Sequence, residues 1–89
     1  MSSLTELTGH VVDINGDPVP EAIIAFVESS VPMPELALLA DEDGRFWLQL
    51  PSGRFVMQAH GSGGKMGKIS FEIEPPKTKE ITIIIRDDA

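Results

Sequence analysis

The sequence predicts an all-β fold, a seven-stranded β-sandwich that occupies residues 1–89 as one domain. Two observations carry this prediction. Short stretches in which apolar and polar residues alternate recur along the chain, and a period of two is typical of strands buried on one face. Eight glycines and seven prolines separate these stretches, as turn residues do in all-β proteins. A length of 89 residues leaves room for a single domain.

The first three strands are expected where alternation is bounded by turn residues. A turn at residues 14–18 follows the first strand, because Asn15-Gly16 tolerates positive φ and Pro18 fixes its own φ. A loop with two prolines follows the second strand. The third has helical propensity as well, but it is short and flanked by turn signals, which favours a strand. These strands are predicted at residues 7–13, 22–28 and 35–40.

Turns and loops also bound the remaining four strands. The acidic turn at residues 41–44 precedes the fourth, and a Pro-Ser-Gly turn separates it from the fifth. A glycine-rich loop at residues 61–67, expected to be flexible, precedes the sixth strand. A proline-containing connection precedes the seventh. These strands are predicted at residues 45–50, 54–60, 68–73 and 80–86.

One face of each predicted strand is apolar and should form the core, because successive side chains of a strand point to opposite faces. The expected core residues are Val11, Ala22, Ile24, Phe26, Phe46, Leu48, Leu50, Phe55, Met57, Ala59, Ile69, Phe71, Ile73, Ile81, Ile83 and Ile85.

The outward face of the second strand is apolar where a solvated strand should be polar. Ile23, Ala25 and Val27 point out, and Val56 of the fifth strand joins them. A contiguous apolar patch on a small domain is typical of an interaction surface, so we expect another protein or a second copy of the chain to bind there. The alternative is that residues 32–39 fold over the patch.

Trp47, the one tryptophan, is also expected to face outward. An exposed aromatic side chain can anchor a protein interface or stack on a sugar, which makes carbohydrate a second possible ligand. The alternative is that a neighbouring loop covers the indole.

Three motifs identify a family resemblance. They are Gly-x-Val-x-Asp from Gly9, Gly-x-Pro-Val-x-x-Ala from Gly16, and Asp-x-Asp-Gly-x-Phe-x-Leu-x-Leu-Pro-x-Gly-x-Phe from Asp41. Together they resemble the carboxypeptidase regulatory-like domain over about residues 7–85, and the core of the domain is expected at about residues 7–86. The resemblance implies a transthyretin-like (prealbumin-like) Greek-key sandwich. It implies no chemistry, because fold does not fix function.

Hydroxyisourate hydrolase shares the transthyretin-like fold, and the first strand looks like this enzyme's. That resemblance would make His10 and Arg45 catalytic groups. The enzyme also needs a late histidine and a C-terminal Tyr-Arg-Gly-Ser, whereas this chain has no Tyr and ends in Arg-Asp-Asp-Ala. Losing half of a cooperating set removes most activity. We therefore expect no enzyme, with a degenerate hydrolase as the remaining catalytic alternative.

Several carboxylates should meet at one end of the sandwich, because consecutive antiparallel strands place alternate turns at the same end. Asp13, Asp17, Asp41 and Asp43 would gather there, with Glu42, Asp87 and Asp88. Calcium binds six to eight oxygens, so this end is the alternative metal site. Asp is also simply a favoured turn residue, and no metal or other cofactor is expected.

The charge balance limits the partners. The net charge is −7 and the pI is about 4.5, which disfavours nucleic acid and anionic membranes. The chain has no cysteine, and its first residues resemble no signal peptide. These features favour a cytoplasmic location, with export without a cleaved signal as the alternative. Self-repulsion among the clustered carboxylates predicts that mild acid relieves strain.

Overall fold

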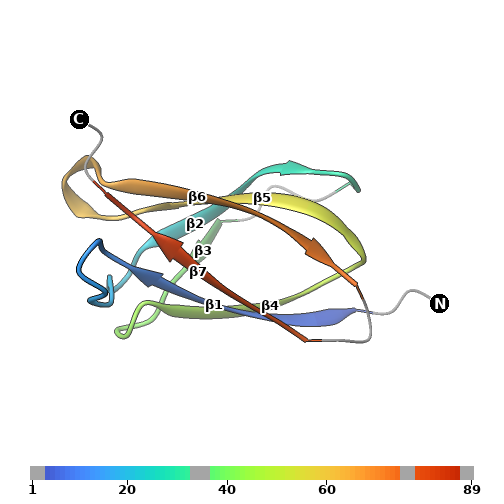
Figure 1. Cartoon of the computed structure of the whole chain (residues 1–89), viewed down its shortest axis with the longest axis horizontal. Coiled ribbons are helices and arrows are strands. Elements are labelled where there is room, and N and C mark those ends of the chain that lie inside the picture. The colour runs from blue at the N-terminus through green and yellow to red at the C-terminus, as the bar shows by residue number, and fades with distance from the viewer. Residues whose placement is uncertain (1–3, 33–36, 75–77, 87–89) are drawn as a thin grey trace.

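The computed structural model describes residues 4–32, 37–74 and 78–86 (Figure 1). It is all-β with two sheets, as the sequence predicts, and the helical content of the described part is the short 3₁₀ turn Ser62–Gly64. The strands are β1 (Thr5–Val12), β2 (Ile23–Ser29), β3 (Ala37–Leu39), β4 (Arg45–Leu50), β5 (Gly53–His60), β6 (Met66–Ile73) and β7 (Lys79–Ile84).

The two sheets have the orders β4-β1-β7 and β3-β2-β5-β6. β1 is antiparallel to β4 and parallel to β7, whereas every pair in the other sheet is antiparallel. The chain therefore crosses between the sheets after β1, β3, β4 and β6. Each of these four connections passes from one sheet to the other at an end of the molecule. The two sheets lie face to face (Figure 1).

The strand ends differ from the prediction by at most two residues, and β4 has the predicted bounds. β6 begins at Met66, two residues early, because the glycine-rich loop is shorter than expected. The Gly61 N–H donates to the Lys65 carbonyl at 2.9 Å, which closes this loop as a turn. The third strand comprises Ala37–Leu39 alone, and residues 35 and 36 of the prediction lie outside the described part.

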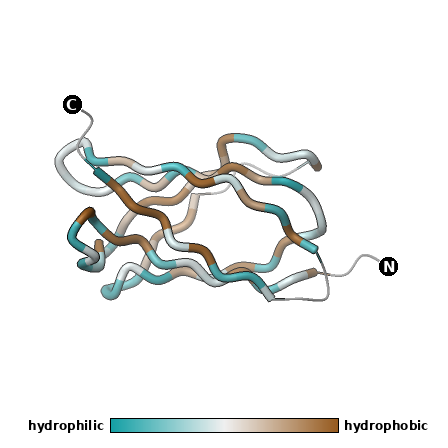
Figure 2. Tube along the Cα trace, in the orientation of Figure 1, coloured by the Kyte–Doolittle hydropathy of each residue, from teal (hydrophilic) through white to brown (hydrophobic). Residues whose placement is uncertain are grey.

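The core lies between the sheets. Figure 2 shows that hydrophobic positions recur along the strands of both sheets. Thirteen of the sixteen predicted core residues are buried, while Phe26, Leu48 and Ile69 are half-buried. Leu48 and Ile69 lie on edge strands, which have a neighbour on one side only. The core also contains Leu7, Val12 and Ala40, which were not among the expected core residues. Leu7 lies in phase with Val11 on β1.

No helix in the described part of the chain has the length and apolar character needed to cross a membrane.

Candidate interaction surface

The outer face of the four-stranded sheet is the strongest candidate for a functional surface. Strand pairing places Ile23 between Leu39 and His60, and Ala25 between Ala37 and Gln58. Leu39 is 67% exposed and Ile23 50%. Apolar side chains of β2 and β3 therefore lie side by side here, with His60 and Gln58 of β5 next to them.

A β-bulge extends this surface along β2. The register passes from Phe26 opposite Met57 to Glu28 opposite Val56, so Val27 is the extra residue. An extra residue bends the strand and re-aims its side chains. Val27 stays 46% exposed, and Glu28 now faces outward beside it.

The structure therefore brings together the four patch residues that the sequence predicts. Ile23, Ala25, Val27 and Val56 all lie on this outer face, with Ala25 and Val56 half-buried. The described residues 37–39 extend the sheet beside β2 and do not cover the patch. We call this surface, with Leu39 added, the apolar face. Leu39 lies within the predicted third strand, but no outward face was assigned to that strand from the sequence.

Trp47 lies on the other sheet, opposite Thr8 of β1, so it is not part of the apolar face. Its side chain is 67% exposed. However, Trp47 and Leu39 line one small hollow of about 140 Å³ at the edge where β3 and β4 lie. Leu39 thus links the indole to the apolar face around the side of the sandwich.

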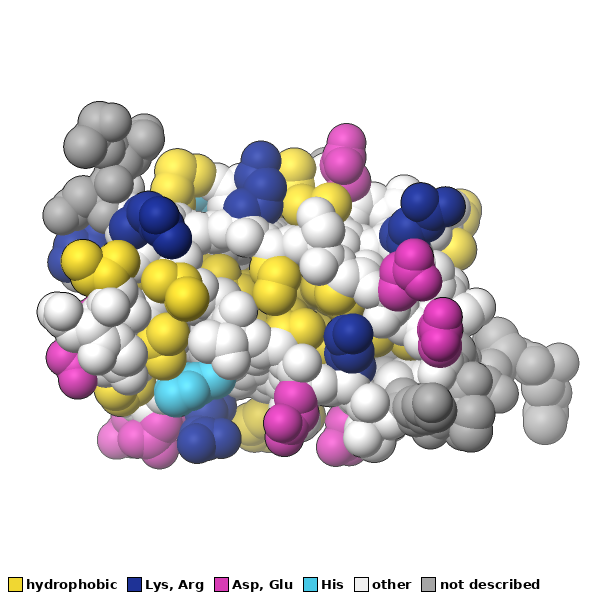
Figure 3. All heavy atoms as spheres, viewed as in Figure 1, with side chains coloured by type: hydrophobic (Ala, Val, Ile, Leu, Met, Phe, Trp, Pro, Cys, Tyr) yellow, Lys and Arg dark blue, Asp and Glu magenta, His cyan; other side chains and the backbone are white. Residues whose placement is uncertain are grey.

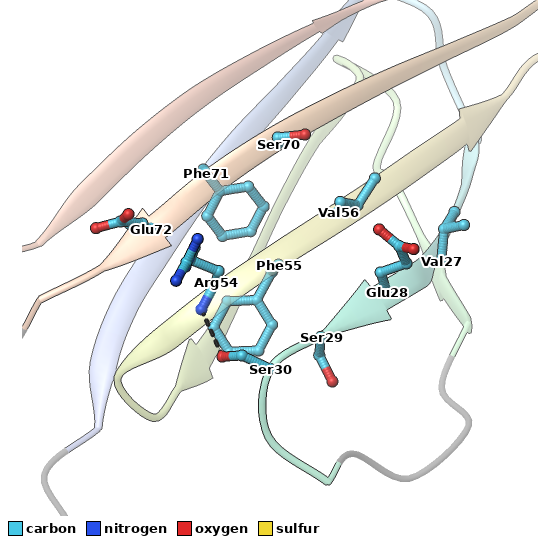
Figure 4. Close-up of a pocket in the computed structure, with 10 residues that line it drawn as sticks. All are labelled: Val27, Glu28, Ser29, Ser30, Arg54, Phe55, Val56, Ser70, Phe71 and Glu72. Carbon is cyan, nitrogen blue, oxygen red and sulfur yellow. Dashed lines mark hydrogen bonds between the residues drawn. The ribbon is translucent and has the colours of Figure 1, made fainter.

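A larger open groove lies at the far end of the apolar face, where β2, β5 and β6 run side by side (Figure 4). Its volume is about 850 Å³. The Arg54 N–H donates to Ser30 Oγ and the Ser30 N–H donates to the Arg54 carbonyl, each at 2.9 Å, which ties the loop after β2 to β5.

Charges of both signs line this groove. Glu72 is the cross-strand neighbour of Arg54, and Glu28 lies on the other side of β5. Val27 and Val56 supply apolar lining between them. No feature of the sequence predicts this groove, because it depends on the strand order and on the bulge.

The acidic turns do meet at one end, beside the loop at residues 61–65 (Figure 1). The Val11 N–H donates to the Gly44 carbonyl at 2.7 Å, and the Glu21 N–H donates to the Asp41 carbonyl at 3.1 Å. These bonds hold the two turns together. Asp87 and Asp88 lie outside the described residues.

Two carboxylates of these turns accept hydrogen bonds from nearby backbone N–H groups. Asp13 Oδ1 accepts the N–H groups of Asn15 and Asp17 at 2.8 and 3.0 Å. Asp41 Oδ1 accepts those of Asp43 and Arg45, both at 2.9 Å. Within the described ranges, no three acidic or histidine side chains are grouped closely enough to hold a metal ion.

These bonds also set the charge state of Asp41. The bond from the Arg45 N–H lowers the pKa of the Asp41 carboxyl below its ordinary value of 3.8, and partial desolvation opposes this. The Asp43 N–H and the positive charges of Arg45 and His10 lower the pKa further. The ionised carboxylate is therefore the form that the folded turn stabilises.

His10 and Arg45 are cross-strand neighbours on β1 and β4. His10 Nε2 lies 3.0 Å from the Asp43 carbonyl oxygen, so the ring is bonded to the acidic turn. His60 lies on the other sheet, beside Ile23. The two histidines of the chain are thus on opposite layers of the sandwich.

Comparison with known proteins supports the fold. The sequence matches no family model and no curated protein. Its structure is similar to the crystal structure of a DUF3823 family protein from Parabacteroides merdae ATCC 43184, with a TM-score of 0.77 and 10% sequence identity. The match covers 98% of this chain and 48% of the other, so this chain spans about half of that protein's length. At this identity the similarity shows the β-sandwich fold alone.

Proposed function

We propose that this protein is a non-catalytic interaction or assembly module that binds another protein through the apolar face. The observation that carries the proposal is the contiguity of Leu39, Ile23 and Val27, all at least 46% exposed on one side of one sheet. Contiguous apolar surface on a small domain costs solubility and is typical of interaction sites. The chain carries a net charge of −7, so the apolar face contrasts with its strongly acidic composition.

We also propose that the sandwich is of the transthyretin-like, carboxypeptidase regulatory-like type, with Greek-key connections. The crossings between sheets and the central place of β1 between β4 and β7 support this assignment. The Asp-x-Asp-Gly motif supports it too, since Asp41 bonds the turn and Gly44 has a φ of +74°, which favours glycine.

The apolar face has the composition of an interface centre. Aliphatic side chains of β2 and β3 form its centre, with His60 and Gln58 of β5 beside them. Glu28, Arg54 and Lys68 lie around this centre. An apolar centre with a polar rim is the usual anatomy of protein interfaces, and a few central side chains provide most of the binding energy. Ile23, which has neighbours on both β3 and β5, is the expected anchor.

The test is capture of a protein from an extract of the source cells by immobilised wild type, Ile23→Glu and Ile84→Glu. Ile84 is a matched control, because it is 47% exposed on the outer face of the other sheet. We expect a protein that wild type and Ile84→Glu retain and Ile23→Glu loses, with affinity weakened by roughly 2 kcal/mol or more. Equal retention by all three proteins would contradict the proposal.

Ligand binding through Trp47 is the second candidate, favoured by the exposed indole and the hollow that it shares with Leu39. Stacking of a sugar on an indole changes its surroundings. Titration with soluble glycans while Trp47 fluorescence is followed tests this alternative, and an unchanged spectrum would remove it.

A further inference from the structure

One edge of the four-stranded sheet is free over most of its length. β6 pairs with β5 from Met66 to Ile73. On its other side, the described residues provide one bridge, in which Met66 and Arg86 exchange two N–H to carbonyl bonds of 3.1 Å. Figure 1 shows β6 and β7 running apart from this bridge. The stretch between Gly67 and Ile73 therefore lacks a strand neighbour there within the described chain.

The bridge fixes which backbone groups point out of the sheet. Met66 directs its N–H and its carbonyl toward Arg86, away from β5. Every second residue of an antiparallel strand directs these groups to the same side. The N–H and carbonyl groups of Lys68, Ser70 and Glu72 therefore point outward, and such unpaired groups are a template for another strand.

The side chains of this edge are arranged symmetrically about Ser70. The sequence reads Lys68-Ile-Ser-Phe-Glu72, with a cation and a carboxylate each two residues from the centre. Lys68, Ser70 and Glu72 are exposed, whereas Ile69 and Phe71 face the core. Ser70 is also the midpoint of the free stretch between Gly67 and Ile73.

We infer that β6 pairs antiparallel with β6 of a second copy of this chain, around a two-fold axis through Ser70. In this register Lys68 lies opposite Glu72 of the second copy, and Glu72 opposite its Lys68. Opposite charges on a cross-strand pair stabilise the pairing, whereas like charges destabilise it. The residues that pair in this register, Lys68, Ser70 and Glu72, are also those whose backbone N–H and carbonyl groups point outward. The backbone hydrogen bonds and the Lys–Glu charge pairs between the two copies therefore favour the same register.

The local charges of the edge match those of a second copy. The net charge of −7 on each copy opposes this pairing at long range, so the attraction must come from the edge itself. The outward positions of the edge, with one Lys and one Glu, are neutral and complementary to themselves. In Figure 3, which looks onto the side where β6 and β7 lie, charges of both signs surround hydrophobic side chains in the middle of the view. A two-fold interface needs only such self-complementarity.

This inference rests on the assembly role proposed above, since it names a second copy as one partner, but it uses the edge rather than the apolar face. Joining two β6 edges makes one continuous sheet, and both apolar faces then lie on the same side of it. The dimer would present two apolar faces to a further partner.

The test is sedimentation equilibrium over a wide dilution range with charge-reversal variants. Wild type should be a concentration-dependent dimer. Lys68→Glu and Glu72→Lys each place like charges opposite one another twice, and should raise the dimer dissociation constant by about tenfold or more. The double variant Lys68→Glu/Glu72→Lys restores both pairs and should dimerise like wild type.

An equimolar mixture of the two single variants is the most specific arm. Every cross-strand pair in the mixed dimer joins opposite charges, so the mixture should form a dimer that neither variant forms alone. A wild type that stays monomeric, a mass that neither variant changes, or a mixture that does not associate would each overturn the inference. Unchanged melting temperatures of the single variants verify that these exposed substitutions leave the fold intact.

Two further variants separate this inference from the proposed function. Ser70→Pro removes an outward N–H from the centre of the edge, a position where a sheet tolerates proline, and should abolish the dimer. Ile23→Glu should leave the mass unchanged. Dimer loss with Ile23→Glu alone would overturn the edge pairing in favour of the apolar face, whereas a monomeric wild type would leave the Ile23-dependent capture intact.

Discussion

Glu21 has a φ of +58°, the one positive value at a non-glycine residue in the described chain. It follows Pro20 in the turn before β2, and its N–H donates to the Asp41 carbonyl at 3.1 Å. That bond holds the two turns together, so the strained backbone is maintained by tertiary structure. Left-handed backbone costs a residue with a Cβ about 1–2 kcal/mol, which glycine avoids.

Glu21→Gly should therefore stabilise the protein. The relief of strain is offset in part by the larger entropy of glycine in the unfolded chain, so we expect a gain of about 0.5–1 kcal/mol in the free energy of unfolding. Urea denaturation measures it. Glu21→Ala is the matched control, because it removes the same charge and keeps the strain; an equal gain in both variants would assign the effect to charge.

Asp41 provides the pH-dependent prediction at this scale. Its pKa is depressed in the folded state, so its contribution to stability is full above the ordinary value of 3.8 and is lost as the pH falls through the folded value. Asp41→Asn should lower the melting temperature at neutral pH, and the difference should shrink toward zero in acid below pH 3.8. Thermal unfolding of both proteins across this range checks it; a difference that grows in acid has the wrong sign.

This direction argues against the expectation that mild acid relieves strain at the acidic end. Asp41 accepts two backbone N–H bonds, and with its pKa lowered the fold favours the ionised carboxylate. Protonation of Asp41 therefore weakens its turn, and charge counting alone could not reveal these bonds.

The pairing of β1 with β4 depends on a glycine under an aromatic ring. Gly9 lies opposite Phe46, and a Cβ on Gly9 would fall 2.1 Å from Phe46 Cζ. The buried ring therefore lies directly on the backbone of β1.

Gly9→Ala should destabilise the protein by about 1–3 kcal/mol, the usual cost of overpacking. A double-mutant cycle with Phe46→Leu identifies the cause, since the smaller side chain makes room for the methyl group and should reduce the penalty. Additive losses would show that the ring is not what the methyl group meets.

At the level of elements, the alternation of apolar and polar residues predicted which side chains of most strands face the core and which face outward. It placed Ile23, Ala25 and Val56 on an outer face because a period of two persists through regular strands. It could not predict the bulge, since Phe26-Val27-Glu28 reads as ordinary alternation, and only pairing with β5 reveals the extra residue. Strand order was equally invisible, so the link from Leu39 to Trp47 and the groove around Arg54 needed the structure.

At the scale of the whole molecule, the strands separate three kinds of surface. The acidic turns lie at one end (Figure 1). The groove lies toward the other end, where it shares Val27 and Val56 with the apolar face (Figure 4). A partner that covers the apolar face therefore meets the mixed charges of Arg54, Glu28 and Glu72 at one end and the carboxylates of the acidic turns at the other. This difference in charge gives a docked partner a preferred direction along the strands.

Amide hydrogen exchange should reflect the position of each strand in its sheet. β1, β2 and β5 have neighbours on both sides, so their amides should exchange slowest, and those of the short edge strand β3 fastest. In β6 the protection should alternate. The amides of Ile69 and Phe71 point toward β5 and should be protected, whereas those of Lys68, Ser70 and Glu72 point outward and should exchange quickly at high dilution.

The dependence of β6 amide exchange on protein concentration tests whether two copies of the chain pair through β6. If two β6 edges pair, the three outward amides gain protection as the protein concentration rises, while those of Ile69 and Phe71 change little because β5 already holds them. Amide exchange of β2 serves as the internal reference, since the pairing leaves it untouched. Protection that rises uniformly along β6 would indicate global stabilisation, and only the alternating increase corresponds to a strand added at the edge.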